Sequence, residues 1–484
     1  MSTHADPRRS VRTSTSTSTS TSTSTSTSTG PEVPGSRSTG AGEAGPRRST
    51  ATSASQISTR LALLLGTGAS AAVLAASGAA ASVPSRPLAT SSPVVVQLWE
   101  SHNGGPVGGA MSALVKEFDA THKSVQVDIV VTKASSKLLA AIPAGNAPAL
   151  AEISHYDGTL VKAGALVSWN TFLAGSKVVS PSNMLPVVWR NGLVQGQHYR
   201  LQTDLKVSEV FYDESLFHKA GIAAAPTTWT ELAADAKKLK GLGVIPLGWK
   251  DSSAHILPAF MSNGGSMLRG SNSVGTAVNF DNSAATRTFT FFRSLYGANE
   301  LQLHHGTTLR EDFAAGKMAM IDGTSAGYAK VLDAVSGKFP VGAFVEPAGS
   351  TGHAYNVAQG LGFVLPKGHT HAQDEAAWTF VQWWFEPAQQ VAWAEQTGFT
   401  PETRASIAAM PASFLRTHPG LVASISAGES PYTFARPVSD SYSEVQASID
   451  ASFFDAVTAK QSVASALQTL QKQGDSYMSG ASEL

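Results

Sequence analysis

The clearest pattern of apolar and polar positions lies between Thr308 and Val335, and it predicts helix, strand, loop and helix. Thr308 with Glu311 three residues later predicts the capping box of a helix. Gly316 predicts the end of that helix, because glycine adopts the left-handed conformation at little cost. The alternation over residues 317–321 predicts a short strand, and a loop of small residues leads into the second helix.

Other apolar runs predict more strands of a mostly parallel sheet. Val94–Trp99 is apolar nearly throughout, as a strand buried on both faces requires, and a helical spacing follows it. Val125–Val131 and Leu150–Ile153 predict the next two strands, and Val244–Trp249 predicts another further on. Ligands of open α/β sheets bind outside the carboxyl ends of strands. Candidate binding residues at or just after these ends are His155 and Trp249. The alternatives are a structural role for His155 and core packing for Trp249.

The first 81 residues predict a leader that precedes the folded protein. Residues 1–60 include a long Ser/Thr alternation with no apolar side chains to bury, which predicts disorder. Residues 61–81 form an apolar run that follows arginines and ends in three alanines, the pattern of a secretory signal peptide. We expect export to the periplasm or beyond, with cleavage near Ser82. Retention of the run as a membrane anchor is the alternative.

Charge and cysteine content narrow the possible functions. Lys+Arg and Asp+Glu each number 35, but residues 1–81 hold seven arginines and three acids. The remainder therefore has 28 basic and 32 acidic residues, a net charge of about −4, which argues against a nucleic-acid partner. Cysteine is absent, which excludes disulfides, thiolate metal sites and a lipidated cysteine. No motif indicates a metal or another cofactor.

A set of motifs in order resembles the substrate-binding proteins of ABC importers, in particular those for glycerol 3-phosphate and sugars. The similarity covers about residues 91–470. It begins with the strand and helix over Val94–Phe118 and includes the F-x-x-G-x-x-A-M helix end near Gly316, with the strand and small-residue loop that follow. The motifs between them are Gly145-Asn146-Ala147-Pro148, Phe211-Tyr212-Asp213, Phe217–Gly221 and Pro226–Trp229.

The resemblance implies a two-lobed α/β fold of the type II periplasmic-binding-protein class, with a ligand cleft between the lobes. Residues 91–206 and 358–410 would form lobe 1, and residues 207–357 and 411–484 would form lobe 2. The partners implied are a small-molecule solute and the membrane permease subunits, with the binding protein itself a monomer and not an enzyme.

The resemblance also adds site residues and bears on the ligand. The turn after the first strand would face the cleft, which makes Trp99 and His102 candidate lining residues. The resemblance implies further ligand contacts at Lys206, Thr324, Ser325, Gln359, Phe399 and Gln446. Glycerol-3-phosphate binders carry a glutamate where His155 stands, a tyrosine at Phe399 and an arginine at Gln446. Sugar binders often place a tryptophan where Ser325 stands. The hydroxyls of Thr324 and Ser325 stand in place of that tryptophan, which looks similar to the glycerol-3-phosphate binders. We therefore expect glycerol 3-phosphate or a glycerophosphodiester as ligand, with a neutral sugar or oligosaccharide as the alternative.

Two further hypotheses remain open. Gly323-Thr324-Ser325-Ala326-Gly327 matches G-x-S-x-G between a predicted strand and helix, the setting of a serine hydrolase nucleophile. Asp333 or Asp374 with His369 or His371 would complete a triad. A sensor that reports a solute to a membrane receptor is the other hypothesis, and the sequence does not separate it from an importer component.

Overall fold

The computed structural model describes residues 92–102, 105–154, 157–270, 275–304, 308–437, 439 and 441–479. Its contacts divide the chain at Ser85 and Arg86, and every described residue lies in the second unit. The predicted leader, over residues 1–60 and 61–81, and the candidate His155 lie outside the described residues. No helix of the described part is both long and apolar enough to cross a membrane.

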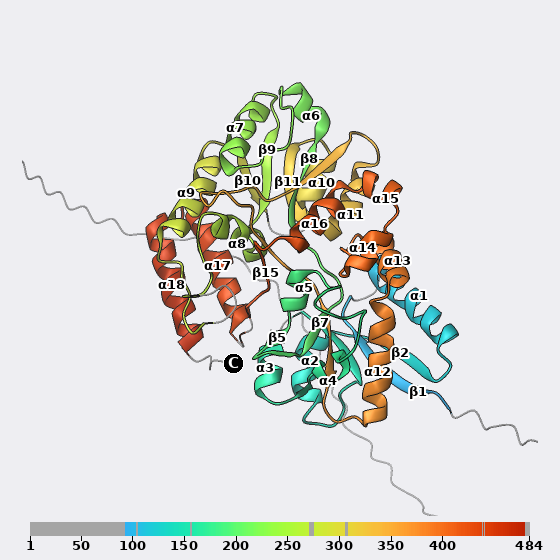
Figure 1. The fold of residues 1–484 in the computed structure, drawn as a ribbon. Coiled ribbons are helices and arrows are strands. Elements are labelled where there is room, and N and C mark those ends of the chain that lie inside the picture. The colour runs from blue at the N-terminus through green and yellow to red at the C-terminus, as the bar shows by residue number, and fades with distance from the viewer. Residues whose placement is uncertain are drawn as a thin grey trace, which may run out of the picture. The chain divides into compact units, whose positions relative to one another are not determined.

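The first sheet is built from the early strands of the chain and one late strand (Figure 1). Its order is β2-β1-β3-β14-β4, and β7 also pairs with β14. β1 is parallel to β2 and β3, whereas β14 is antiparallel to its partners. The strands are β1 (Val94–Glu100), β2 (Val125–Val131), β3 (Leu150–Ile153), β4 (Leu166–Val167), β7 (Arg200–Gln202) and β14 (Gly362–Pro366).

Helices cover this first sheet on the face to which Val96 and Leu98 of β1 point. Both side chains are fully buried, and they belong to a core with apolar residues of α1, α12 and α13. The bounds of these helices are α1 (Gly105–Thr121), α12 (His371–Trp384) and α13 (Pro387–Thr397). Pro387 begins α13, where its missing N–H has no helical partner to lose.

The second sheet has the order β10-β9-β11-β8-β12. β9, β10 and β11 are parallel, and β8 runs antiparallel to β11 and β12. Apolar residues of α7, α9, α17 and α18 form the core on one face, and residues of α10 and α11 form the core on the other. The elements are β8 (Ser208–Asp213), β9 (Ile245–Lys250), β10 (Leu301–His304), β11 (Met318–Thr324), β12 (Val341–Val345), α7 (Trp229–Lys240), α9 (Ser283–Gly297), α10 (Thr308–Ala314), α11 (Tyr328–Val335), α17 (Tyr442–Val457) and α18 (Val463–Ser479).

Shorter elements connect and flank the two sheets. They are α2 (Ala134–Ala141), α3 (Asp157–Lys162), α4 (Asn170–Leu173), α5 (Pro186–Arg190), β5 (Leu193–Val194), β6 (Gln197–His198), α6 (Glu214–Lys219), α8 (Ser253–Ser262), the 3₁₀ turn η1 (Ser325–Gly327), β13 (Asn356–Val357), α14 (Arg404–Ala409), α15 (Ala412–Thr417), α16 (Pro419–Glu429) and β15 (Thr433–Phe434).

The helix, strand, loop and helix predicted between Thr308 and Val335 are confirmed as α10, β11, η1 and α11. Gly316 has a φ of 72°, the left-handed conformation expected at a helix end. The strand is longer than predicted and continues to Thr324, because residues 322–324 pair with residues 208–210 of β8.

The chain crosses between the sheets after β7 and returns before β14, and the two crossovers pair with each other. The Lys206 N–H donates to Gln359 O at 3.1 Å, and the Gln359 N–H donates to Lys206 O at 2.9 Å. A third segment joins them, since the Thr400 N–H donates to Leu205 O at 2.9 Å. Gly360 follows the bridge with a φ of 139°, which only glycine adopts readily.

Candidate functional site

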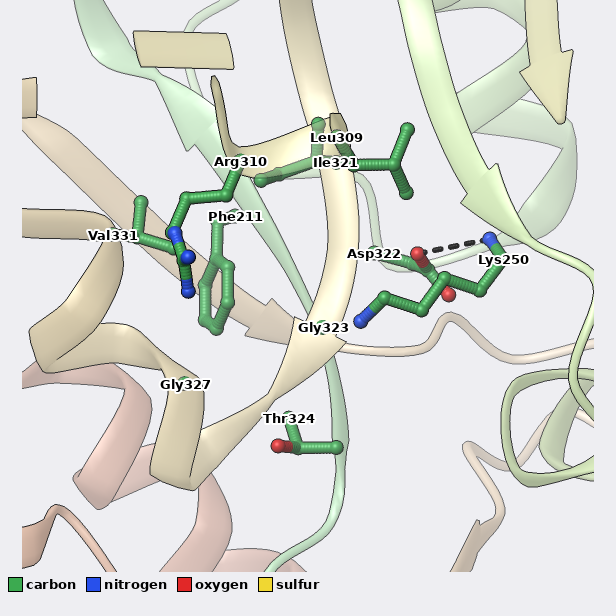
Figure 2. A pocket seen from close by; sticks show the side chains of 10 residues that line it. All are labelled: Phe211, Lys250, Leu309, Arg310, Ile321, Asp322, Gly323, Thr324, Gly327 and Val331. Carbon is green, nitrogen blue, oxygen red and sulfur yellow. Dashed lines mark hydrogen bonds between the residues drawn. The ribbon is translucent and has the colours of Figure 1, made fainter. Parts of the chain in front are cut away.

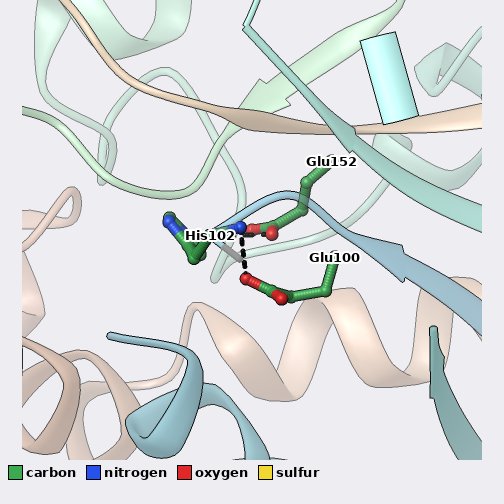
Figure 3. A group of neighbouring side chains, drawn as sticks. All are labelled: Glu100, His102 and Glu152. Atoms are coloured by element: carbon green, nitrogen blue, oxygen red, sulfur yellow. Dashed lines mark hydrogen bonds and ion pairs between the residues drawn. The ribbon is translucent and has the colours of Figure 1, made fainter. Parts of the chain in front are cut away.

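Buried acids and a histidine gather where β1 and β3 end, next to the first crossover. His102 follows β1, and its Nε2 lies 3.7 Å from Glu152 Oε2 of β3 and 3.9 Å from Asp204 Oδ2 of the crossover. The His102 backbone N–H donates to Glu100 Oε1. Figure 3 shows the carboxylates of Glu100 and Glu152 beside His102. Apolar strands therefore deliver a polar cluster to their carboxyl ends, where α/β folds place their ligands.

Burial dominates the electrostatics of this cluster. It raises the pKa of Glu152 well above its usual value, and the charges of Asp204 and Glu100 raise it further. Burial also raises the pKa of Asp204 to about 7, against the opposing effect of Lys206. The pKa of His102 is lowered to about 4, first by burial and then by Lys206, so its imidazole is neutral at pH 7.

An aromatic pair lies against this cluster. Phe399 stacks on Trp393 of α13, with ring centroids 5.8 Å apart and an interplanar angle of 6°. The His102 ring lies 6.0 Å from Phe399, and Lys206 Nζ lies 5.6 Å from the Phe399 centroid. At such a distance an ammonium is attracted to the ring face. The cluster is thus packed against two buried aromatic rings and a lysine.

Lys206 on the first crossover is subject to the charges of three other basic residues. Burial lowers the pKa of Lys206, and the positive charges of Arg436, Lys330 and Lys250 lower it further, while Asp204 opposes the shift. Like charges disfavour the charged form of a lysine, and an opposite charge favours it.

A pocket of about 130 Å³ lies at the carboxyl end of β11. Lys250, Arg310, Thr324 and Gly327 are among the residues that line it. Figure 2 shows the side chains of Lys250 and Arg310 reaching the pocket from opposite sides of β11. The Thr324 side chain is half-buried at the edge of this pocket.

The structure brings some of the predicted site residues together. Phe399 lies near both His102 and Lys206, and Gln359 pairs with Lys206. The Gln359 backbone, expected to face the ligand, is instead engaged in this pairing, and its carbonyl also accepts from Gln202 Nε2 at 2.9 Å. Thr324 lines the pocket at the carboxyl end of β11.

Trp99 and Gln446 form hydrogen bonds with residues outside this group. Trp99 points to the sheet face opposite Leu98, and its Nε1 donates to Gln97 Oε1 at 3.0 Å. Gln446 is half-buried on α17 and donates to Ser253 Oγ at 3.1 Å.

The prediction that Trp249 stacks on a ligand is wrong. Its side chain is fully buried in the core of the second sheet, with ring centroids 5.8 Å from Trp229 and 5.0 Å from Phe292. Trp249 therefore contributes to stability, which is the core-packing alternative.

Ser325 does not have the surroundings of a catalytic nucleophile. It is 1% exposed, and its Oγ accepts from the Val207 N–H at 3.3 Å. Among the described residues no histidine forms a hydrogen bond with this oxygen. His371 lies on α12, where its side chain is largely exposed and pairs with Glu375. Ser325 holds the crossover to the end of β11, so its buried side chain also departs from the predicted ligand contact.

Sequence reasoning missed Glu100, Glu152 and Glu402. Each is at most 1% exposed and has a carboxylate oxygen without a hydrogen-bond partner among the described residues. A signal was present for Glu100 and Glu152, because each is a charged residue inside or at the end of an apolar strand, and charged residues are almost never fully buried unless they are paired. Glu402, whose Oε1 accepts from the Leu205 N–H, reaches the crossover only through the tertiary fold.

The sequence matches known proteins at the level of a family. The profile of the bacterial extracellular solute-binding proteins matches residues 113–422. The sn-glycerol-3-phosphate-binding periplasmic protein UgpB of Pectobacterium atrosepticum is 21% identical over 338 residues, which cover 64% of this chain and 74% of that protein. A putative binding protein of Brucella abortus is 25% identical over 221 residues, 43% of this chain and 52% of its own length.

Solved structures are similar over most of the described part. The cyclic alpha-maltosyl-1,6-maltose binding protein of Arthrobacter globiformis has a TM-score of 0.69 at 20% identity, covering 80% of this chain and 99% of that chain. UgpB of Mycobacterium tuberculosis, solved with glycerophosphocholine, has a TM-score of 0.67 at 17% identity, covering 79% and 98%. These likenesses confirm the two-lobed type II fold, and the family match confirms the resemblance seen in the sequence. The chain belongs to the bacterial extracellular solute-binding proteins.

Proposed function

We propose that this protein is the extracytoplasmic binding component of an ABC importer that captures glycerol 3-phosphate or a glycerophosphodiester and delivers it to membrane permeases. The family supports solute capture. The observation that carries the ligand class is the pocket at the carboxyl end of β11, which the basic residues Lys250 and Arg310 line together with Thr324.

Two like charges at one pocket repel each other, and an anion between them relieves that repulsion. Lys250 of β9 and Arg310 of α10 are far apart in the sequence, so only the folded chain brings both to this pocket, which Thr324 and Asp322 also line. A phosphate accepts charge-assisted hydrogen bonds from such groups, which are about twice as strong as neutral ones.

The acceptors and the aromatic pair suit the remainder of the ligand. Glycerol hydroxyls would donate to carboxylates such as Asp204, and the Phe399 ring would cover an apolar face. The same two features also favour the second candidate, a neutral sugar, because sugars offer hydroxyl pairs and a stacking face. The basic residues separate the two candidates, since a neutral sugar leaves their mutual repulsion in place.

The two candidates are separated by calorimetry with glycerol 3-phosphate, glycerophosphodiesters and neutral oligosaccharides. We expect saturable binding of a phosphate ligand, which Lys250→Ala weakens by about 1.5–3 kcal/mol, the contribution of a charged hydrogen bond. Thr324→Val should weaken it by about 1–3 kcal/mol, through an unpaired buried partner. Lys237→Ala, on the exposed face of α7, is the matched control and should leave affinity unchanged.

Two results would contradict the proposal. Saturation by an oligosaccharide with no response to any phosphate ligand would favour the second candidate. Chemical conversion of the recovered solute would point to an enzyme.

A further inference from the structure

Three side chains of the first lobe each offer one unpaired, buried ligand atom to a common point. Glu100 Oε2, His102 Nε2 and Glu152 Oε2 have no hydrogen-bond partner among the described residues. The side chains of His102 and Glu152 are 8% and 0% exposed. One ligand atom from each of the three residues can be chosen so that all lie within 4.8 Å of one another.

The other polar atoms of these residues hold the three side chains in place. Glu100 Oε1 accepts from the His102 backbone N–H, and Glu152 Oε1 accepts from Thr203 Oγ1 at 3.1 Å. Ser101 Oγ donates to the Glu152 carbonyl at 2.8 Å, which fixes the chain between Glu100 and His102 to β3. Outer contacts of this kind orient metal ligands in known sites.

We propose that Glu100, His102 and Glu152 bind one divalent transition-metal ion, of which Zn²⁺ is the probe. One imidazole nitrogen and two carboxylate oxygens form a donor set suited to Zn²⁺, which binds such atoms at about 2.0–2.2 Å. Metal bonds of that length place neighbouring ligand atoms roughly 3.0–3.6 Å apart, so each atom needs to move inward by about an ångström or less. The 3.7 Å separation of His102 Nε2 and Glu152 Oε2 is already close to this geometry.

Charge and position support the site and suggest a further ligand. Metal binding would take the protons from the two carboxyl groups, and a divalent ion would cancel the formal charge of two carboxylates and a neutral imidazole, which is unfavourable to bury without compensation. Asp204 Oδ2, 3.9 Å from His102 Nε2, is in reach as a fourth ligand, and it lies on the crossover between the sheets. A bound ion would then tie the first lobe to that crossover, whichever solute the protein captures.

The test is a titration of the full chain, purified without a polyhistidine tag and stripped with a chelator, with ZnCl₂ in the absence of solute. We expect saturation at one Zn²⁺ per chain and weaker binding of Ca²⁺, which disfavours imidazole. Glu152→Gln and His102→Ala should each lower the Zn²⁺ affinity at least about 100-fold. His371→Ala, which removes an exposed histidine 3.3 Å from Glu375, is the control for adventitious binding and should change nothing.

A second measurement needs no variant. X-ray absorption at the zinc edge of the wild-type protein should show one imidazole with carboxylate oxygens. The proposal would be overturned if Zn²⁺ does not bind saturably, if Glu152→Gln leaves the Zn²⁺ affinity unchanged, or if His371→Ala abolishes binding. A preference for Ca²⁺, or a coordination shell with two or more imidazoles, would also overturn it. Solute binding is measured on chelator-treated protein, so failure of the metal site is distinct from failure of the proposed function.

Discussion

At the scale of single residues, one strand in each of the two sheets is one residue longer at its carboxyl end than the sequence predicts. The sequence patterns put Trp99 and Trp249 at the carboxyl ends of their strands, yet each strand continues one residue further. Side chains alternate between the two faces of a strand, so the next residue points the other way. Glu100 and Lys250, which follow the tryptophans, are the residues that reach the candidate metal site and the pocket.

Replacing Trp249 by alanine should mainly reduce stability. A fully buried aromatic side chain that is cut back to alanine costs about 3–5 kcal/mol of the free energy of unfolding. Trp99→Ala is the control, because the half-buried Trp99 should cost clearly less. Urea denaturation of both variants measures the difference. If Trp249→Ala is as stable as the wild type but no longer binds solute, Trp249 belongs to the binding site and not to the core.

At the scale of elements, the sequence predicted correctly those helices, strands and turns that interactions between residues close in the chain determine. The stretch between Thr308 and Val335 follows the sequence pattern because a helix cap, a glycine at φ 72° and strand alternation all act within a few residues. The meeting of Glu152 with Asp204 and Glu402 has no local signal, since it depends on sheet order and on where three chain segments cross. Burial of Ser325 likewise follows from its contact with Val207 on the first crossover.

The crossover at Gly360 should tolerate no side chain. Its φ of 139° is unfavourable for other residues, and a Cβ there would collide with the Asp204 carbonyl oxygen. Gly352 is the matched control, because its φ is 76° and no atom lies within 4 Å of the position that a Cβ would take. We expect Gly352→Ala to cost about 1–2 kcal/mol of unfolding free energy and Gly360→Ala several times more. If the two variants lose the same unfolding free energy in thermal or urea unfolding, the crossover at Gly360 can move away from the crossover at Asp204 at little cost.

At the scale of the whole molecule, buried acids should set how stability depends on pH. Glu209 on β8 is fully buried, and neither of its carboxylate oxygens has a hydrogen-bond partner among the described residues. Burial raises its pKa well above the usual 4.5. Glu209 neither lines the pocket nor belongs to the candidate metal site, so it offers a test that does not depend on solute or metal.

The sign of the effect follows from proton linkage. A carboxyl group whose pKa is raised by folding contributes stability that is fully present below its unfolded pKa and is lost as pH rises through the folded pKa. Glu209→Gln removes this loss. The variant should therefore gain stability relative to the wild type as pH rises above about 4.5, by about 1.4 kcal/mol for each pH unit between the unfolded and folded pKa values.

Glu231→Gln is the control with the opposite sign. Glu231 completes the capping box of α7, and hydrogen bonds from Thr227 lower its pKa. Its contribution to stability is present above the unfolded pKa and is lost as pH falls through the folded pKa. Urea unfolding of the wild type and both variants at about pH 4.5 and about pH 8 would compare the slopes. At the higher pH we expect Glu209→Gln to be the more stable of the two variants relative to the wild type. Toward the lower pH the destabilisation caused by Glu231→Gln should disappear. If the stability of both variants changes with pH in parallel, Glu209 is ionised in the folded protein without penalty.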